Sequence, residues 1–331
     1  MRITNNMIIA NMTRNISNNQ ARENKYQTQL ATGKKISVPS DDPVVAARAL
    51  KLRTDVSKLE QYKKNIGDAQ SWLSATDEAL SKLGAVLQQA RDKMVQAANG
   101  TNTPQETQAI AMELKQLRIQ AVHLSNSTYS GRYIFSGFKT DQKVMNDDET
   151  SPDFGKFLIN VDTATVVDPA ATPPKTEIAK ERILYEVGVG DSININITGG
   201  DLFNSRYTGN NNTGIAVASE IPSMIKMFDG VIASMENGDS KAISDQLATI
   251  DLEIGNVLRV RADIGARQNR MDLTEDRMDS DLVNFTASMS TNEDIDVAEA
   301  IMNLKNEENV YQASLAAGAR VIQQSLVDFL N

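Results

Sequence analysis

Apolar residues recur at alternating steps of three and four along most of this 331-residue chain, a spacing that predicts long amphipathic helices. The clearest stripe begins at Val45 and ends at Ala97, and Thr76 is its only polar member. Proline is absent from residues 44–103, 105–151 and 223–331, so uninterrupted helices are permitted there. At about 1.5 Å per residue, the helix over 45–97 would be roughly 80–90 Å long.

Local signals mark where this helix begins and where the chain returns. Asp42 stands before Pro43 as an N-cap followed by a proline at the first helical position. Thr103 and Glu106 have the spacing of a capping box, and the apolar residues of 110–124 follow it. We therefore predict that the segment with the apolar stripe from Ile110 to Leu124 returns as an antiparallel partner of the long helix.

The middle of the chain has a different pattern. Residues 183–189 and 192–198 alternate like two strands joined by a turn at Gly190-Asp191, and 157–161 reads as another strand. We predict a small β-rich insertion after residue 131. Helical spacing resumes near 215.

The second long stripe covers residues 243–285. Polar residues interrupt it every seven positions, at Arg261, Gln268 and Glu275. Thr291 and Asp294 resemble a second capping box before the last helix.

Two terminal stripes lie outside the predicted bundle. The first helix is expected over 5–32 with Gly33 as its stop, and the last stripe runs from 297 to 329. Seven Asn within residues 1–24 weaken helicity, so we expect the first segment to be poorly ordered until something packs on it. Polar Asn19, Glu23 and Glu308 dilute the seams, which favours pairing with each other or with neighbouring copies. The predicted assembly interface is Ile9, Met12, Ile16, Tyr26, Leu30, Ile301, Leu304, Tyr311, Leu315, Ile322, Leu326 and Phe329.

These patterns predict a mainly α fold with a β-rich insertion: a long antiparallel helical bundle with paired N- and C-terminal coiled-coil helices. We expect three domains. Residues 1–35 plus 293–331 form a terminal coiled-coil assembly domain, and 36–131 plus 238–292 form a helical bundle or rod. Residues 132–237 form a β-rich outer domain with a helical return segment.

The composition of the chain argues against several classes of function. The net charge of −9 argues against nucleic acid as a partner, although residues 1–40 are basic. No apolar run approaches the ~20 residues of a membrane span, and residues 1–10 lack the apolar core of a secretory signal peptide. The chain has no cysteine, and His123 is its only histidine, interpreted as a solvated or packing residue. Asp147-Asp148-Glu149 lacks calcium-loop spacing. We expect no enzyme, metal site or cofactor.

Several segments carry a family resemblance. Residues 1–7 (MRITNNM), 30–36 (LATGKKI), 39–43 (PSDDP), 131–137 (GRYIFSG) and 315–330 resemble the hook-associated protein 3 family of the bacterial flagellum, within the wider flagellin family. Flagellins usually have Ala before the paired aspartates, whereas here Pro39 and Pro43 flank them. Gln324 departs from the Pro expected in the tail, which could lengthen the last helix.

The resemblance implies a secreted structural subunit of the hook–filament junction, exported unfolded by the flagellar type III apparatus. Its implied partners are its own copies in a ring, hook-associated protein 1 on the hook side, flagellin on the filament side and an export chaperone. Terminal helices would form the inner coiled-coil tube, with the β domain facing outward. The alternatives left open are a divergent flagellin and, lower, a sensory or ligand-binding helical module.

Overall fold

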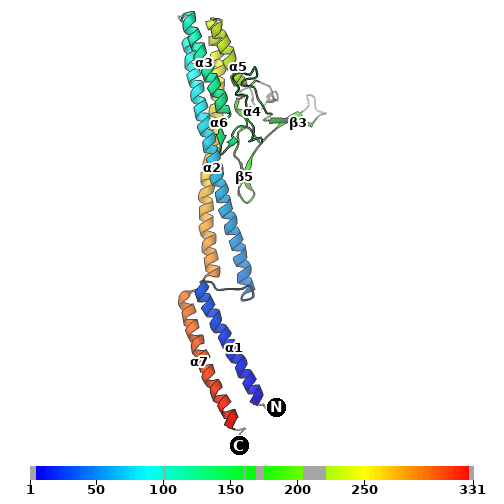
Figure 1. The fold of residues 1–331 in the computed structure, drawn as a ribbon, viewed down its shortest axis with the longest axis vertical. Helices are drawn as coiled ribbons and strands as arrows, with labels where there is room; N and C mark the ends of the chain where they lie inside the picture. The colour runs from blue at the N-terminus through cyan, green and yellow to red at the C-terminus, as the bar shows by residue number, and fades with distance from the viewer. Residues whose placement is uncertain (1–4, 100–101, 160–161, 169–174, 204–220, 328–331) are drawn as a thin grey trace. The chain divides into compact units, whose positions relative to one another are not determined.

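The computed structural model describes residues 5–99, 102–159, 162–168, 175–203 and 221–327 (Figure 1). Within them the chain is mainly helical, as predicted. The helices are α1 Asn5–Thr32, α2 Pro43–Ala98, α3 Pro104–Ser125, α4 Gly199–Phe203, α5 Ser223–Glu236, α6 Ser240–Glu293 and α7 Val297–Val327. The strands are β1 Thr128–Tyr129, β2 Arg132–Tyr133, β3 Asp162–Asp168, β4 Lys175–Lys180, β5 Leu184–Gly188 and β6 Asp191–Asn194, which pair as three antiparallel hairpins.

Contacts divide the chain into two compact units. Unit 1 comprises Met1–Glu60 and Asp279–Asn331, and unit 2 comprises Gln61–Met278. Unit 1 thus holds α1, α7, the first part of α2 and the last part of α6. The three-part division expected from the sequence stays a prediction.

Unit 2 contains a helical bundle built on the predicted stripes. From Ile66 to Ala97 every stripe position of α2 is buried, including Thr76, whose hydroxyl donates to the Trp72 carbonyl oxygen at 2.8 Å. That bond satisfies the one polar member of the stripe. Ion pairs join α3 to α5, with 2.8 Å between Arg118 and Asp229.

The polar interruptions of α6 set its register against α2. Each has a polar partner on α2: Arg261 with Asp77, Gln268 with Ser74, and Glu275 with Gln70. The partner positions run backwards along α2 as those of α6 run forwards, so the helices are antiparallel in unit 2. A slip in this register would leave all three pairs unmatched.

Two predicted helix starts are confirmed. The Asp42 carboxylate accepts the N–H groups of Val44 and Val45 at 3.0 and 3.1 Å. Thr103 and Glu106 form the reciprocal capping box. Gly33, at φ +70°, ends α1 as predicted, in a backbone region that suits glycine.

The predicted capping box at Thr291 and Asp294 is wrong. Both lie at the end of α6 or just beyond it, and the Thr291 hydroxyl donates to the Ala287 carbonyl oxygen one turn back. Asp296 caps α7 instead, accepting the N–H groups of Ala298 and Glu299 at 2.9 and 3.2 Å. Helix α6 continues beyond the end of its apolar stripe, and polar contacts described below stabilise its last turn.

In the β-rich insertion, the hairpin β5–β6 is confirmed, with Gly190 at φ +73° in its turn. The strand predicted over 157–161 is wrong for the described residues, where Phe157 makes only an isolated bridge to Met145. The Asn126 side-chain oxygen accepts hydrogen bonds from the N–H groups of Val144 and Met145. These two N–H groups are therefore not available to pair with a strand at Phe157. Hairpin β3–β4 was not predicted.

Candidate assembly surface

Helices α1 and α7 of unit 1 lie side by side and antiparallel (Figure 1). The seam of α1 consists of Ile9, Met12, Ile16, Tyr26 and Leu30, which are all half-buried while their flanking residues are mostly exposed. Their role in an assembly interface stays a prediction. Helix α1 therefore has one partner within the chain, which supplies the packing that its Asn-rich sequence needs.

The polar members of the α1 seam are also satisfied. Asn19 is buried and accepts from the Arg22 guanidinium at 2.6 Å. The same guanidinium forms an ion pair with Glu307 of α7 at 3.1 Å. A polar pair at a seam costs stability but fixes register.

Helix α7 presents small residues to α1. Ala300 and Gly318 are buried, and a Cβ atom at Gly318 would lie 3.4 Å from Met12 Cε and 3.5 Å from Ile16 Cδ1. Sequence reasoning missed these two residues because it followed large apolar side chains. The signal was present as small residues on one helical face, which let two helices approach closely.

The predicted interface residues of α7 divide into three groups. Leu304 and Tyr311 are half-buried beside the seam, whereas Ile301 and Leu315 remain 47% and 44% exposed. Ile322 and Leu326 lie in α7, but their side chains are outside the described residues, as is the whole of Phe329.

Helix α7 consequently has a second apolar face that the described residues leave exposed. Val297, Ile301 and Leu315 share it by helical periodicity, with exposed Ala316 and Ala319 beside Leu315. We call these five residues the open face of α7. The described outer surface of α1 is instead dominated by Asn, Gln, Thr, Arg and Lys.

Exposed apolar side chains concentrate in unit 1. Among the described residues, unit 1 carries more than half of the exposed large hydrophobic side chains, although it holds about a third of the chain. They are Met7, Ile8, Val38, Val44, Leu50, Val283, Val297, Ile301, Met302, Val310 and Leu315. Extensive exposed apolar surface is typical of sites that bind another protein or a membrane.

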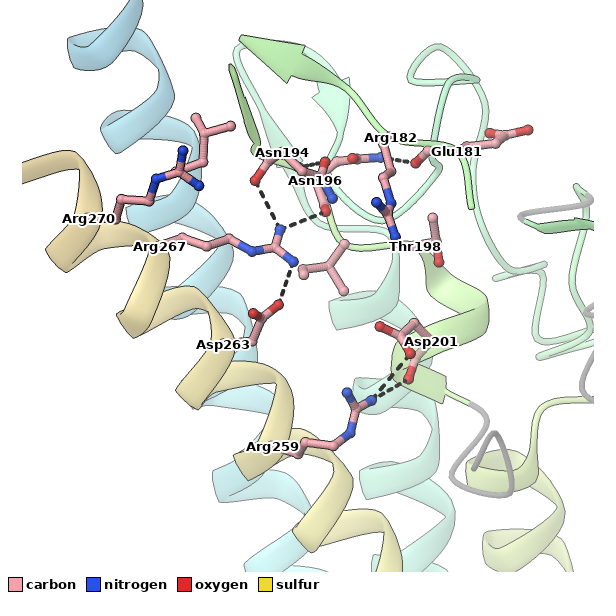
Figure 2. A pocket seen from close by; sticks show the side chains of 12 residues that line it. Glu181, Arg182, Asn194, Asn196, Thr198, Asp201, Arg259, Asp263, Arg267 and Arg270 are labelled. Atoms are coloured by element: carbon pink, nitrogen blue, oxygen red, sulfur yellow. Dashed lines mark hydrogen bonds and ion pairs between the residues drawn. The ribbon is translucent and has the colours of Figure 1, made fainter. Parts of the chain in front are cut away.

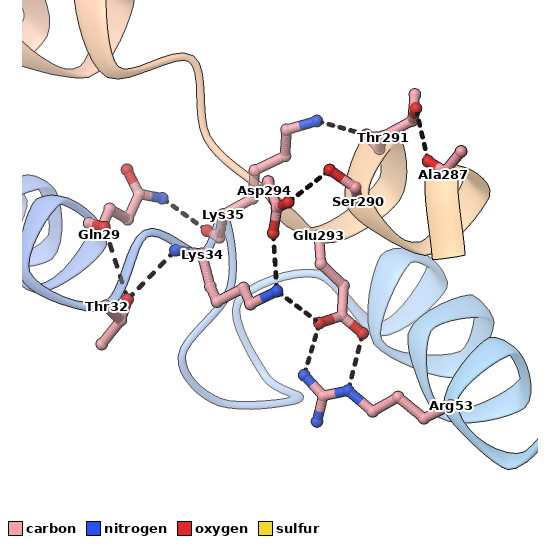
Figure 3. Close-up of polar contacts among 10 residues, drawn as sticks. All are labelled: Gln29, Thr32, Lys34, Lys35, Arg53, Ala287, Ser290, Thr291, Glu293 and Asp294. Carbon is pink, nitrogen blue, oxygen red and sulfur yellow. Dashed lines mark hydrogen bonds and ion pairs between the residues drawn. The ribbon is translucent and has the colours of Figure 1, made fainter. Parts of the chain in front are cut away.

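A charged cluster lies where α6 ends in unit 1 (Figure 3). The Glu293 side chain is 1% exposed, and its two carboxylate oxygens accept from the Arg53 guanidinium at 2.8 and 2.6 Å. Lys34 Nζ lies 3.4 Å from Glu293 and 2.6 Å from Asp294. We call Lys34, Arg53, Glu293 and Asp294 the Glu293 cluster.

The cluster is charged at neutral pH. Hydrogen bonds from Arg53, supported by Lys34, lower the pKa of the Glu293 carboxyl despite its burial. A hydrogen bond from Lys34 lowers the pKa of Asp294, and the same bond raises the pKa of Lys34. Sequence reasoning did not identify this cluster, because its members are separated by up to 260 residues.

A polar hollow of about 560 Å³ lies at the foot of the β insertion in unit 2 (Figure 2). Arg267 of α6 donates to the carbonyl oxygen of Asn194 at 3.0 Å and pairs with Asp263. Arg259 donates to Asp201, and Arg270 pairs with Asp191. These guanidinium groups connect β6 and α4 to α6 by hydrogen bonds and ion pairs. The residues that line the hollow therefore stabilise the packing of the β insertion on α6.

In the part of the chain that the structure describes, no group of three or more acidic, His or Cys side chains could hold a metal ion. None of the helices in that part combines the length and the apolar character needed to cross a membrane.

A helical bundle with a β insertion and paired terminal helices defines a helical assembly protein, and sequence comparison gives its family. Residues 3–140 match the bacterial flagellin N-terminal helical region, and residues 247–330 match the bacterial flagellin C-terminal helical region. The two matches together cover more than half of the chain. The chain therefore belongs to the bacterial flagellin family, whose members are structural components of the bacterial flagellum.

Within this family, the chain is similar to proteins of the hook–filament junction. Flagellar hook-associated protein 3 of Escherichia coli K12 is 28% identical over 96% of each chain, and that of Salmonella typhimurium LT2 is 28% identical over 95% of each. The flagellin of Bacillus subtilis 168 is 25% identical over 98% of this chain and 97% of its own.

Solved structures agree on the fold. A putative flagellar hook-associated protein from Vibrio parahaemolyticus matches with a TM-score of 0.59 at 22% identity, covering 77% of this chain and 100% of its own. Flagellar hook-associated protein-3 from Legionella pneumophila matches with a TM-score of 0.54 at 14% identity, covering 72% and 97%. The protein is located in the flagellum, and its partners are other flagellar proteins.

Proposed function

We propose that this chain is the structural subunit that joins the flagellar hook to the filament, and that its terminal helices drive its assembly. Similarity to hook-associated protein 3 over nearly the whole chain supports the junction. The open face of α7 is the observation that carries the mode of assembly. Nothing in this role requires catalysis or a cofactor.

A helix with two apolar faces needs two neighbours. Around α7, the buried residues Ala300 and Gly318 are separated from the open-face residues Ile301 and Leu315 by roughly 60–100°, given about 100° per residue. Helix α1 covers one face, and a second copy of the chain would cover the other. When the open face packs on a different surface of the next copy, the contact repeats head to tail, and it forms a ring where the rotation between copies closes.

The proposed partners follow from this arrangement and from the family resemblance. They are further copies of the chain in a ring, hook-associated protein 1 on the hook side and flagellin on the filament side. An export chaperone is the fourth, because the exposed apolar residues of unit 1 would promote aggregation before assembly.

The open face is tested by placing charge on it. We expect Ile301→Asp combined with Leu315→Asp to lower the fraction of hooks that carry filaments at least tenfold, counted by electron microscopy in cells lacking the wild-type gene. Burying two carboxylates at a subunit contact is costly, whereas both positions are exposed in the single chain. Circular dichroism of the purified variant should stay unchanged.

The matched control is Leu273→Asp, because Leu273 is 72% exposed on α6 in unit 2. This variant should support filaments like the wild type. Normal filaments on hooks carrying the Ile301→Asp, Leu315→Asp variant would exclude the open face as the subunit contact.

A divergent flagellin is the second candidate, favoured by the 25% identity to the Bacillus subtilis protein. Purified flagellin subunits should grow long filaments by themselves, whereas a junction subunit should give short polymers or none. Long filaments of the purified chain, seen by negative-stain electron microscopy, would select the flagellin role.

A further inference from the structure

Two chain connections run alongside each other in unit 1. One leads from α1 to α2, and the other leads from α6 to α7. The Lys35 N–H donates to the Glu293 carbonyl oxygen at 2.6 Å, and the Ile295 N–H donates to the Gly33 carbonyl oxygen at 3.1 Å. Four helix ends therefore meet at one place, and the Glu293 cluster is located there (Figure 3).

Hydrogen bonds that do not involve the Glu293 side chain also join the two connections. Lys35 Nζ donates to the Thr291 carbonyl oxygen at 2.8 Å, and Gln29 donates to the Lys35 carbonyl oxygen at 2.6 Å. The Asn292 amide donates to the Val45 carbonyl oxygen at 3.2 Å. The two connections would therefore stay joined without the Glu293 side chain. The burial of this carboxylate needs another explanation.

An ion pair with one buried member adds little stability here, because burying the Glu293 carboxylate offsets its attraction to Arg53 and Lys34, whose side chains are 57% and 37% exposed. Apolar residues of similar size often stabilise a protein as well or better. The pair instead fixes the relative orientation of the segments that carry it, because a bidentate arginine–carboxylate contact restricts both distance and angle. Glu293 contacts Arg53 of α2 and Lys34 of the connection after α1, so it constrains both at once.

Orientation at this point matters because α7 is long. Its 31 residues span about 45 Å, so a tilt of about 10° at Val297 would displace its far end by roughly 8 Å. A ring closes only when every copy presents its contact faces at the same angle. An error of several ångström would misalign the open face of α7 with the next copy.

We propose that Glu293 is a positioning residue for assembly, which acts through Arg53 and Lys34 to hold the α1–α7 pair at one orientation to the adjoining ends of α2 and α6 within unit 1. This inference rests on the proposed function, in which the terminal helices make the subunit contacts. The Glu293 cluster supplies geometry and not net stability.

The experiment uses the full chain and its lack of cysteine. Spin labels at Val44→Cys on α2 and Met302→Cys on α7, which are 62% and 61% exposed, report the distance across the cluster. The test variant is Glu293→Met with Arg53→Met, which removes the ion pair and leaves neither partner unpaired. Labels at Lys25→Cys and Val310→Cys on α1 and α7 provide a control distance within the helix pair.

We expect a narrow Val44–Met302 distance distribution in the unsubstituted cluster and one at least twice as broad in the Met/Met variant. The thermal midpoint should be equal or higher, the control distance should stay narrow, and the fraction of hooks with filaments should fall at least tenfold. Glu293→Asp, which keeps the charge, should restore part of that fraction.

An unchanged distance distribution in the Met/Met variant would overturn the positioning role, as would a broad distribution with normal filaments. A broad distribution in the unsubstituted cluster would overturn it too. Failure of the proposed function looks different. A chain that does not join hooks to filaments still gives a distance result, and the Ile301→Asp, Leu315→Asp variant should keep the narrow distribution.

Discussion

At the residue scale, the best-defined local device is the capping box before α3. Thr103 Oγ1 accepts the Glu106 N–H at 3.3 Å, and the Glu106 carboxylate accepts the Thr103 N–H at 2.7 Å. Two N–H groups that the helix itself leaves without partners are thereby satisfied. Pro104 at the first helical position needs no such partner.

We expect Thr103→Ala to lower the free energy of unfolding of unit 2 by about 1 kcal/mol, the usual cost of losing an N-cap side chain. Urea unfolding followed by Trp72 fluorescence measures this. Trp72 is the only tryptophan, is buried in unit 2, and lies edge to face with Tyr129. Thr103→Ser is the control and should stay within a few tenths of a kcal/mol.

The capping box also has a defined pH dependence. Hydrogen bonds from the Thr103 N–H and then from its hydroxyl lower the pKa of the Glu106 carboxyl. The contribution of the ionised Glu106 carboxylate to the stability of unit 2 is therefore complete above the ordinary pKa of Glu. It is lost as the pH falls through the lowered pKa. The stability difference between wild type and Glu106→Gln should shrink over that acidic range, and a constant difference would contradict this assignment.

At the element scale, the pairing of α1 with α7 depends on a close approach at Gly318. Met12 and Ile16 lie where a side chain at that position would extend. The distances of 3.4 and 3.5 Å leave room for one methyl group with a small movement of the flexible Met12 end. A larger side chain would have to displace α1.

We therefore expect opposite effects from two substitutions at this position. Gly318→Ala should be neutral or stabilise α7 by up to about 1 kcal/mol, because glycine is a poor helix former. Gly318→Leu should separate the helices and remove hydrogen-exchange protection from α1, measured by mass spectrometry. Ala316→Leu is the control, since Ala316 is exposed and its substitution should leave α1 protected. Protection of α1 in Gly318→Leu would contradict the close approach.

At the scale of the whole molecule, two kinds of surface are separated between the units. Unit 2 buries its stripes in a bundle, whereas unit 1 keeps much apolar surface exposed. Charged residues also differ, because residues 1–40 are basic in a chain whose net charge is −9. The proposed function thus assigns stability to unit 2 and assembly to unit 1.

Deletion of residues 1–32 or of residues 297–331 should abolish incorporation into flagella while leaving a soluble helical protein. Helices α1 and α7 contribute the seam and the open face, whereas the buried core of unit 2 lies in Ile66–Met278. Electron microscopy measures incorporation, and Trp72 emission with its urea midpoint measures unit 2. Truncated protein that still connects hook and filament would disprove the terminal-helix mechanism.

The sequence by itself determined the long helices, two helix starts and the apolar face of α1. Apolar spacing gave α1, α2 and α6, and Asp42 and Thr103 marked helix starts by local side-chain bonds that need no distant partner. The seam of α1 was also readable, because α1 has a single apolar face. Periodicity and capping are properties of neighbouring residues, so a linear pattern contains them.

Only the tertiary structure decided which face of α7 meets α1 and how the chain connections are joined. Helix α7 has small residues on one side and large apolar residues on another, and a stripe does not tell which side a neighbour selects. The Glu293 cluster unites residues far apart in sequence, and the partners of Arg261 and Gln268 depend on the antiparallel register. Such choices are made by packing between distant segments, and no local pattern encodes them.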